Sequence, residues 1–214
     1  RDAEKLMIAR LDWYQEQGVE IHLGDRASQI DREKRLVHSE AGIQLAYDQV
    51  VLATGSYPFV PPVPGMENRG VFVYRTIEDL QRIIEFGKTA RRCAVIGGGL
   101  LGLEAAKAAF DDAGSKVLVR KIESLGVHVH LNKATRQFLG AGGVEQLEFA
   151  DGERLDVDMV IVSCGIRPRD ELARTCGLEV GERGGVLVND RLQTSDPDIY
   201  AVGEVAQHNG MVYG

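Results

Sequence analysis

Three glycines with the spacing Gly-x-Gly-x-x-Gly are the residues of this 214-residue chain that point most directly to a chemical role. Gly97, Gly99 and Gly102 lie between an apolar run at 93–96 and an Ala- and Leu-rich stretch at about 100–110 with helical spacing. Glycine permits a tight strand-to-helix turn, and the N-terminus of the helix offers N–H groups to phosphate. The pattern predicts a dinucleotide pyrophosphate site, and a strand–helix turn without a ligand is the alternative.

Two further apolar runs also end in glycine. The strand predicted at 199–202 leads into Gly203 and Glu204, and the run at 50–53 leads into Thr54 and Gly55. Glycine allows a ligand to approach the backbone, and a carboxylate accepts hydrogen bonds from a polyol. Each run alone is an ordinary strand end, but the pair indicates a second ligand-binding edge.

An internal repeat organises the elements that would position these residues. The segment 18–23 matches 126–131, and 48–58 matches 158–168 at nearly the same offset. Each copy is predicted to contain an amphipathic helix, a strand, a polar meander and an apolar strand buried on both faces, as in a parallel sheet. The predicted helices and strands are helices at about 3–17 and 116–125, strands at 19–23 and 127–131, and apolar strands at 50–53 and 159–163.

The repeat predicts an α/β fold with two Rossmann-like dinucleotide-binding domains, each combining a parallel sheet with an antiparallel meander, and both incomplete. After the helix at 100–110, a second strand ending in an acidic residue is expected but is missing. Alternatively, 116–119 is that strand, and Arg120 and Lys121 then favour NADP. The first copy has no room for its own Gly-rich loop ahead of Gly18, so we expect the chain to be part of a larger protein.

Composition excludes several classes of function. The net charge of −7 gives no basic surface for nucleic acid, and no apolar run approaches the length needed to span a bilayer. The N-terminus lacks the features of a signal peptide. Three cysteines form neither a CxxC pair nor a metal-ligand pattern, which favours a reducing cytoplasm and predicts no metal site and no dithiol relay.

Several runs of the sequence resemble one enzyme family. The chain is similar to the flavoproteins with two dinucleotide-binding domains, the pyridine nucleotide–disulfide oxidoreductase superfamily. Within it, the chain most resembles the large-subunit family of NAD(P)H-dependent nitrite reductases. Glu204 stands where the superfamily usually has Asp. The runs that carry the resemblance are 53–65, 73–80, 97–106, 120–126, 165–173 and 194–204.

The resemblance implies an FAD-dependent oxidoreductase that passes hydride from NAD(P)H to FAD and electrons onward to another domain or subunit. Siroheme and an iron–sulfur cluster would belong to the remainder of the protein. It implies an FAD domain at 1–79 and 187–214 and an inserted NAD(P) domain at 80–186, and it is compatible with a homodimer. The implied cofactor-binding residues are Thr54, Gly55, Gly97, Gly99, Leu100, Leu101, Gly102, Gly165, Gly203 and Glu204.

The sequence leaves alternatives open. The chain could be a rubredoxin or ferredoxin reductase or an NADH oxidase on the same scaffold, or a non-catalytic nucleotide-binding module. No residue is predicted to be catalytic, because hydride transfer to a flavin needs no acid–base group from the protein. His208 is a candidate for a position near the cofactor. Asp48 and Asp158 are predicted turn residues, and Thr76 is a predicted helix N-cap.

Overall fold

The computed structural model describes residues 9–97, 120, 123–124 and 126–212. The chain divides into two compact units, which are described separately below. Unit 1 comprises Arg1–Tyr57 with Arg167–Gly214, and unit 2 comprises Pro58–Ile166. Within the described part of the chain, no helix has both the length and the apolar character needed to cross a membrane.

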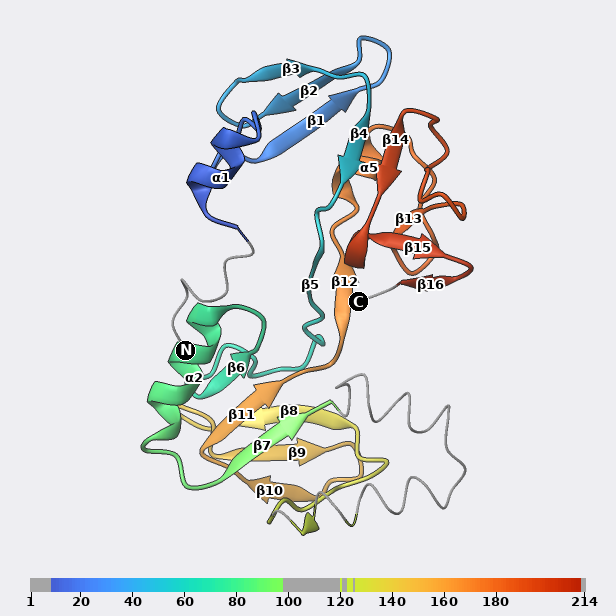
Figure 1. The fold of residues 1–214 in the computed structure, drawn as a ribbon. Coiled ribbons are helices and arrows are strands. Elements are labelled where there is room, and N and C mark those ends of the chain that lie inside the picture. Colours follow the sequence, from blue (N-terminus) through green and yellow to red (C-terminus); the bar gives the residue numbers. More distant parts are fainter. Residues whose placement is uncertain (1–8, 98–119, 121–122, 125, 213–214) are drawn as a thin grey trace. The chain divides into compact units, whose positions relative to one another are not determined.

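Unit 1 is built around two neighbouring parallel strands, β4 and β14, which pair from Ile199↔Val50 to Ala201↔Leu52 (Figure 1). An antiparallel meander, β1-β2-β3, precedes them in sequence, β5 pairs with β12, and β13, β15 and β16 form a further small sheet. The elements are α1 (Leu11–Glu16), β1 (Ala27–Asp31), β2 (Leu36–Ser39), β3 (Gln44–Ala46), β4 (Val50–Leu52), β5 (Ser56–Pro58), β12 (Ile166–Pro168), α5 (Glu171–Thr175), β13 (Val186–Leu187), β14 (Ile199–Ala201), η2 (Gly203–Val205), β15 (Ala206–His208) and β16 (Met211–Val212).

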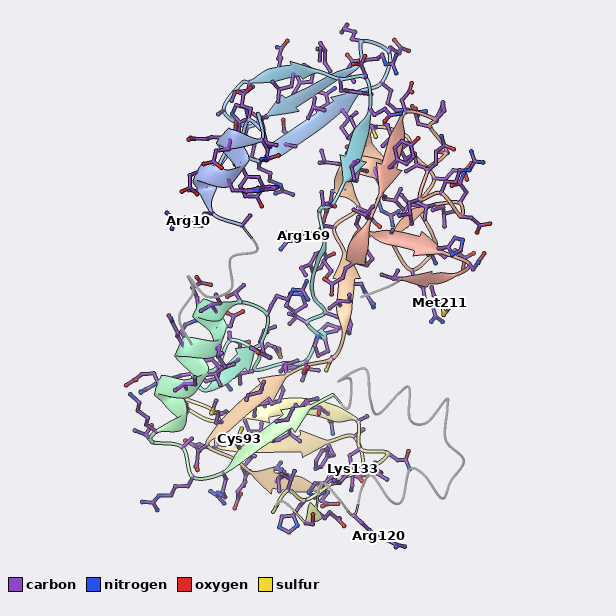
Figure 2. All side chains as sticks on the ribbon, in the orientation of Figure 1. Arg10, Cys93, Arg120, Lys133, Arg169 and Met211 are labelled. Carbon is purple, nitrogen blue, oxygen red and sulfur yellow. The ribbon has the colours of Figure 1, made fainter. Side chains whose placement is uncertain are left out.

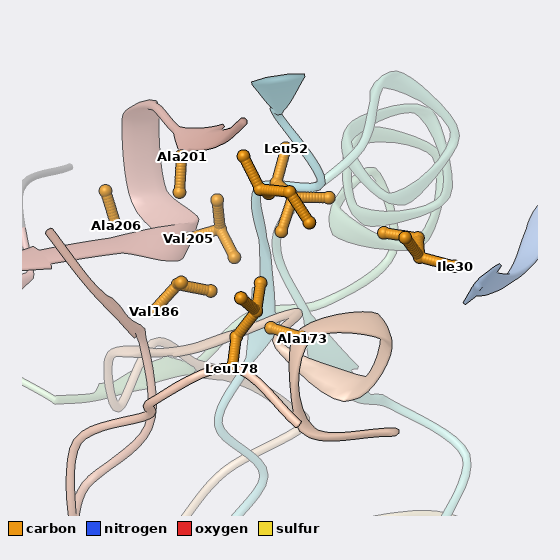
Figure 3. Packing of buried hydrophobic residues seen from close by; sticks show 9 residues of the cluster. Ile30, Leu52, Ala173, Leu178, Val186, Ala201, Val205 and Ala206 are labelled. Carbon is orange, nitrogen blue, oxygen red and sulfur yellow. The ribbon is translucent and has the colours of Figure 1, made fainter. Parts of the chain in front are cut away.

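The core of unit 1 gathers small and branched apolar side chains from β1, β4, β13 and β14, helix α5 and the turn η2 (Figure 3). Ile199, Val186 and Val205 are completely buried there. Burial of such side chains is the main favourable contribution to folding. Because this core contacts both β4 and β14, it fixes the ends of these two strands, where the candidate site residues lie.

Unit 2 has the same plan. Strand β11 lies between β6 and β7, parallel to both, and an antiparallel meander, β8-β9-β10, packs its apolar side chains into the same core. The elements are β6 (Val71–Val73), α2 (Ile77–Gly87), β7 (Cys93–Ile96), β8 (Thr135–Leu139), β9 (Gln146–Phe149), β10 (Arg154–Asp156) and β11 (Met159–Val162).

Helix α2 begins as the sequence predicts. The Thr76 hydroxyl accepts a hydrogen bond from the Asp79 N–H at 3.2 Å, and the Asp79 carboxylate accepts one from the Thr76 N–H at 3.0 Å. This reciprocal pair satisfies two donors at the start of the helix. The prediction that Thr76 is an N-cap is confirmed.

The internal repeat extends to an irregularity in the strands. The β1–β2 ladder shifts register between Ala27 and Gln29, and the β8–β9 ladder shifts between Thr135 and Gln137. The two irregularities are separated by the same offset as the matched Gly18 and Gly126. A β-bulge at equivalent positions is a local feature that two unrelated meanders would not be expected to share. The structure therefore supports a duplicated unit.

The second pair of matched segments, 48–58 and 158–168, is separated by slightly more residues than the first pair, 18–23 and 126–131. The extra residues lie in one turn. The turn between β1 and β2 spans 32–35, whereas the turn between β8 and β9 spans 140–145 and is two residues longer. The longer turn places Val144 in the core at 5% exposure, and the Val144 N–H donates to the Arg69 carbonyl at 2.8 Å. The two copies thus differ in length at a turn rather than within a strand.

Two predictions about strands are wrong. Residues 19–23 and 127–131 form no strand, and most of the apolar side chains there are exposed, with Leu23 at 72% and Leu131 at 62%. No described strand lies beside either segment to complete a ladder of hydrogen bonds. The helix predicted at 3–17 is present over Leu11–Glu16, while its first residues and most of 116–125 lie outside the described residues.

The prediction of burial on both faces holds for β11 but is wrong for β4. Successive side chains of a strand point to opposite faces. On one face of β11, Val160 is 0% exposed, and on the other, Met159 is 3% exposed. In β4, Leu52 is buried at 5% whereas Val51 is 59% exposed. Only the Leu52 face of β4 packs against the core among the described residues.

Candidate functional site

Two pairs of parallel strands each carry glycines just beyond their carboxyl ends. Gly55 follows β4 and Gly203 follows its neighbour β14 in unit 1. Gly97 follows β7 and Gly165 follows its neighbour β11 in unit 2. In open parallel sheets, ligands bind beyond the carboxyl ends of the strands. Each unit therefore brings two of the predicted residues to one sheet edge.

In the unit 1 site, both glycines have backbone conformations that L side chains rarely adopt. Gly55 has φ +67° and Gly203 has φ +69°, and a Cβ atom added to either would meet no atom within 4 Å. The glycines are therefore required by conformation, and the space beside their backbones is open. These features fit a ligand that approaches the main chain closely, as a dinucleotide does.

Polar contacts join the two strand ends of the unit 1 site. The Ser56 hydroxyl donates to Glu204 Oε2 at 2.7 Å, and the Val202 N–H donates to the Leu52 carbonyl at 2.9 Å. Glu204 thus lies beside the segment that follows β4. Its carboxylate can accept several hydrogen bonds at once, which suits the hydroxyl groups of a polyol or ribose.

Arg169 braces the segment that contains Thr54 and Gly55, and it is labelled in Figure 2. Its N–H donates to the Gly55 carbonyl at 2.8 Å, and its carbonyl accepts from the Thr54 hydroxyl at 2.6 Å. Its guanidinium donates to the Ser56 carbonyl at 3.2 Å and lies 5.7 Å from the Tyr57 ring centroid. The predicted residues Thr54 and Gly55 are therefore both bonded to the backbone of one residue.

In the unit 2 site, Gly97 ends β7 against the backbone of β11. Its φ is +102°, and an added Cβ would lie 2.0 Å from the Ser163 carbonyl oxygen, so only glycine fits. Gly165, with φ +96°, instead has no atom within 4 Å of an added Cβ. The remaining predicted residues of this site lie outside the described residues, as does the predicted helix at 100–110; they are Gly99, Leu100, Leu101 and Gly102.

The other candidates have structural partners. The Asp158 carboxylate accepts hydrogen bonds from the N–H groups of Arg91 and Arg92 at 3.0 and 2.9 Å, which lowers the pKa of Asp158 and fixes the start of β7. Asp48 lies in a bend ahead of β4. His208 pairs with Asp190 at 2.8 Å through Nε2. Among the described residues, no group of His, Cys, Asp and Glu is arranged to hold a metal ion.

The sequence reasoning overlooked Ser56 and Arg169. Ser56 directly follows Thr54 and Gly55, and Arg169 directly follows Pro168, the repeat counterpart of Pro58. Ser56 lies within one of the matched segments and Arg169 directly follows the other, and this position in the repeat is the signal that could have drawn attention to them. Their partners could not be identified from it, because the Ser56–Glu204 contact joins residues 148 apart.

Comparisons with known proteins agree with this arrangement. Residues 3–213 match the family model described as pyridine nucleotide-disulphide oxidoreductase. The chain is 45% identical to the nitrite reductase (NADH) large subunit of Escherichia coli K12 over 99% of its own length and 28% of that protein. It is 45% identical to the nitrite reductase [NAD(P)H] large subunit of Klebsiella oxytoca, covering 24% of it. The chain thus spans about a quarter of these relatives.

Solved structures have the same fold. A ferredoxin reductase from Rhodopseudomonas palustris superposes with a TM-score of 0.86 at 28% identity, covering 97% of this chain and 56% of that one. A chain of the covalent putidaredoxin reductase–putidaredoxin complex gives a TM-score of 0.83 at 31% identity, again covering 97% of this chain and 56% of that one. Together with the paired glycine-ended strands and a family match over nearly every residue, these likenesses show that the chain belongs to the pyridine nucleotide-disulphide oxidoreductase family.

Proposed function

We propose that this chain carries parts of the FAD and NAD(P)H sites of an oxidoreductase that passes hydride from NAD(P)H to FAD and electrons onward, as the diaphorase part of a nitrite reductase large subunit. One observation carries the proposal: each unit has a parallel strand pair that ends in glycines with left-handed backbone and with open space at Gly55, Gly203 and Gly165. The identity of 45% to two nitrite reductase large subunits supports the wider assignment.

The residues divide between the two nucleotides according to their unit. FAD would be held by Thr54, Gly55, Gly203 and Glu204, in a domain formed by 1–79 and 187–214. NAD(P)H would be held by Gly97, Gly99, Leu100, Leu101, Gly102 and Gly165, in an inserted domain at 80–186. The bounds of these two proposed domains differ from those of the two compact units, since residues 58–79 belong to unit 2 and residues 167–186 to unit 1. The open cradle at Gly55 and Gly203, with a carboxylate beside it, fits the diphosphate and polyol of a flavin dinucleotide.

The protein's own contribution to the reaction is binding and orientation. Bound FAD supplies the hydride-accepting chemistry. Glu204 would accept hydrogen bonds from ligand hydroxyls. The open space beside Gly55 and Gly203 would let the ligand come close to the backbone N–H groups of these two residues. Siroheme and an iron–sulfur cluster would belong to another part of such a protein.

The test uses the protein that contains this chain, at its full natural length. It is purified, its visible spectrum is recorded, and NADH or NADPH is added without oxygen. A yellow protein that either nucleotide bleaches supports the proposal, and the relative rates identify the preferred nucleotide. A colourless protein that binds NADH would instead favour a non-catalytic nucleotide-binding module.

A second candidate is a ferredoxin or rubredoxin reductase, or an NADH oxidase, on the same scaffold. It is favoured by the fold likeness to a ferredoxin reductase at a TM-score of 0.86. Oxidation of NADH that depends on nitrite supports the first proposal, whereas oxidation that depends on an added ferredoxin, a rubredoxin or oxygen supports the second. A cytoplasmic location and a homodimer also belong to the proposal, and cell fractionation and light scattering test them.

A further inference from the structure

Ser56 and Glu204 form a contact that the cofactor assignment does not explain by itself. Ser56 is 5% exposed, and its hydroxyl donates to Glu204 Oε2 at 2.7 Å. Ser56 opens β5, while Glu204 lies in the turn η2 beyond β14. A buried hydroxyl bonded to a carboxylate is a charge-assisted hydrogen bond, which is stronger than one between neutral groups.

Ser56 is fixed in place independently of Glu204. Its carbonyl accepts a hydrogen bond from the Arg169 guanidinium at 3.2 Å, and the preceding carbonyl, of Gly55, accepts from the Arg169 N–H at 2.8 Å. The Arg169 guanidinium itself lies over the Tyr57 ring. The hydroxyl is therefore presented by a braced strand, and it can determine where the Glu204 carboxylate lies.

The length of the Glu204 side chain explains why a hydrogen bond from Ser56 would help ligand binding. Glutamate has one more rotatable bond than aspartate, so an unrestrained carboxylate would lose more conformational freedom when a ligand binds. A hydrogen bond from Ser56 to one carboxylate oxygen removes part of that freedom beforehand. The carboxylate retains acceptor capacity for ligand hydroxyls, because two carboxylate oxygens offer about four lone-pair sites.

We infer that Ser56 is a positioning residue of the FAD site, which orients Glu204 for hydrogen bonding to the flavin's hydroxyl groups. This inference rests on the proposed function. It assigns to the serine a role that depends on glutamate, rather than aspartate, at position 204.

The experiment measures FAD affinity in a double-mutant cycle, using the full natural-length protein stripped of flavin and titrated with FAD by fluorescence quenching. Ser56→Ala should weaken FAD binding about tenfold, which corresponds to about 1.4 kcal/mol. In the Glu204→Asp background the same change should have less than about a twofold effect, because the shorter side chain withdraws the carboxylate from Ser56. The KM for NADH should not change, because the predicted nicotinamide nucleotide residues lie in unit 2.

The matched control is Ser28→Ala, which removes an exposed serine hydroxyl of β1 that donates to the His38 carbonyl. It should leave FAD affinity unchanged. Equal losses from Ser56→Ala with and without the Glu204→Asp change, or no loss with Glu204 in place, would overturn the inference while leaving FAD binding intact. An unaltered protein that binds no FAD would overturn the proposed function and this inference together.

Discussion

Substitution of Gly97 by alanine tests the close approach of β7 and β11 in unit 2. An added Cβ would lie 2.0 Å from the Ser163 carbonyl oxygen and 2.6 Å from its carbonyl carbon. Both atoms are backbone, so relief requires the strand ends to separate. The Ser163 N–H donates to the Ile96 carbonyl at 2.8 Å, and this hydrogen bond would lengthen as they separate.

The cost can be estimated from its parts. A non-glycine residue at φ +102° is strained by about 1–3 kcal/mol. Overpacking against backbone adds about 1–3 kcal/mol, and the disturbed hydrogen bond adds about 1 kcal/mol. We expect Gly97→Ala to lower the free energy of unfolding by about 3–7 kcal/mol, which is a large part of the ~5–15 kcal/mol typical of a domain.

Alanine substitutions at two other glycines of unit 2 distinguish the cost of backbone strain from the cost of the steric clash at Gly97. Gly165→Ala introduces strain at φ +96° without a close contact, so we expect a loss of about 1–3 kcal/mol. Gly142 has neither a left-handed φ nor an atom within 4 Å of an added Cβ, so Gly142→Ala should be neutral or slightly stabilising. Urea unfolding followed by circular dichroism measures all three, and amide exchange over 159–164 reports on the β11 end. A loss for Gly97→Ala no larger than that for Gly165→Ala would refute the reasoning.

Two further predictions concern side-chain partners. Arg32 pairs with Asp196 at 2.6 Å and donates to two carbonyls, so Arg32→Ala should cost about 2 kcal/mol at neutral pH, whereas Arg10→Ala, in an exposed pair, should cost little. Burial raises the pKa of Asp196, but hydrogen bonds from the Asp198 N–H and from Arg32 outweigh this effect and hold the pKa below the ordinary aspartate value of 3.8. The stabilisation by the Arg32–Asp196 pair is therefore present above pH 3.8 and is lost as the pH falls through the lower pKa of the folded state. The gap between the urea midpoints of the Arg32→Ala and unaltered proteins should therefore narrow on acidification, leaving the part that comes from the two carbonyl hydrogen bonds, and a constant gap would contradict this. Thr76→Ala should cost about 1 kcal/mol in the same assay by removing the N-cap of α2, and an equal loss in Thr76→Ser would rule out the hydroxyl as the cause.

Apolar runs that end in glycine predicted the positions of the parallel strands well. Strands β4, β7, β11 and β14 lie where such runs occur, and a glycine follows each strand within three residues, although Val51 of β4 and Val95 of β7 are exposed. The pairing of β4 with β14 could not be predicted in this way. It joins segments from opposite ends of the chain, and no local pattern specifies a partner so distant in sequence.

The predicted strands at 19–23 and 127–131 show the opposite limitation. Their β-branched residues suit a strand, yet a strand also needs a neighbour for its hydrogen bonds, and the described residues provide none. Likewise, the chemistry of Glu204 was recognisable from its place after Gly203, whereas its serine partner was not. Residue type was enough to propose Glu204 as a cofactor-binding residue, but not to identify the side chain that contacts it.

The longer turn between β8 and β9 has a consequence for how the duplicated halves diverged. It allows Val144 to fill a space in the core of unit 2 and ties the turn to Arg69, and the shorter turn of the first half offers no equivalent side chain. A chimera that received the shorter turn would therefore have a cavity where Val144 packs. After the duplication, the halves ceased to be interchangeable at this loop even though their ladders still match.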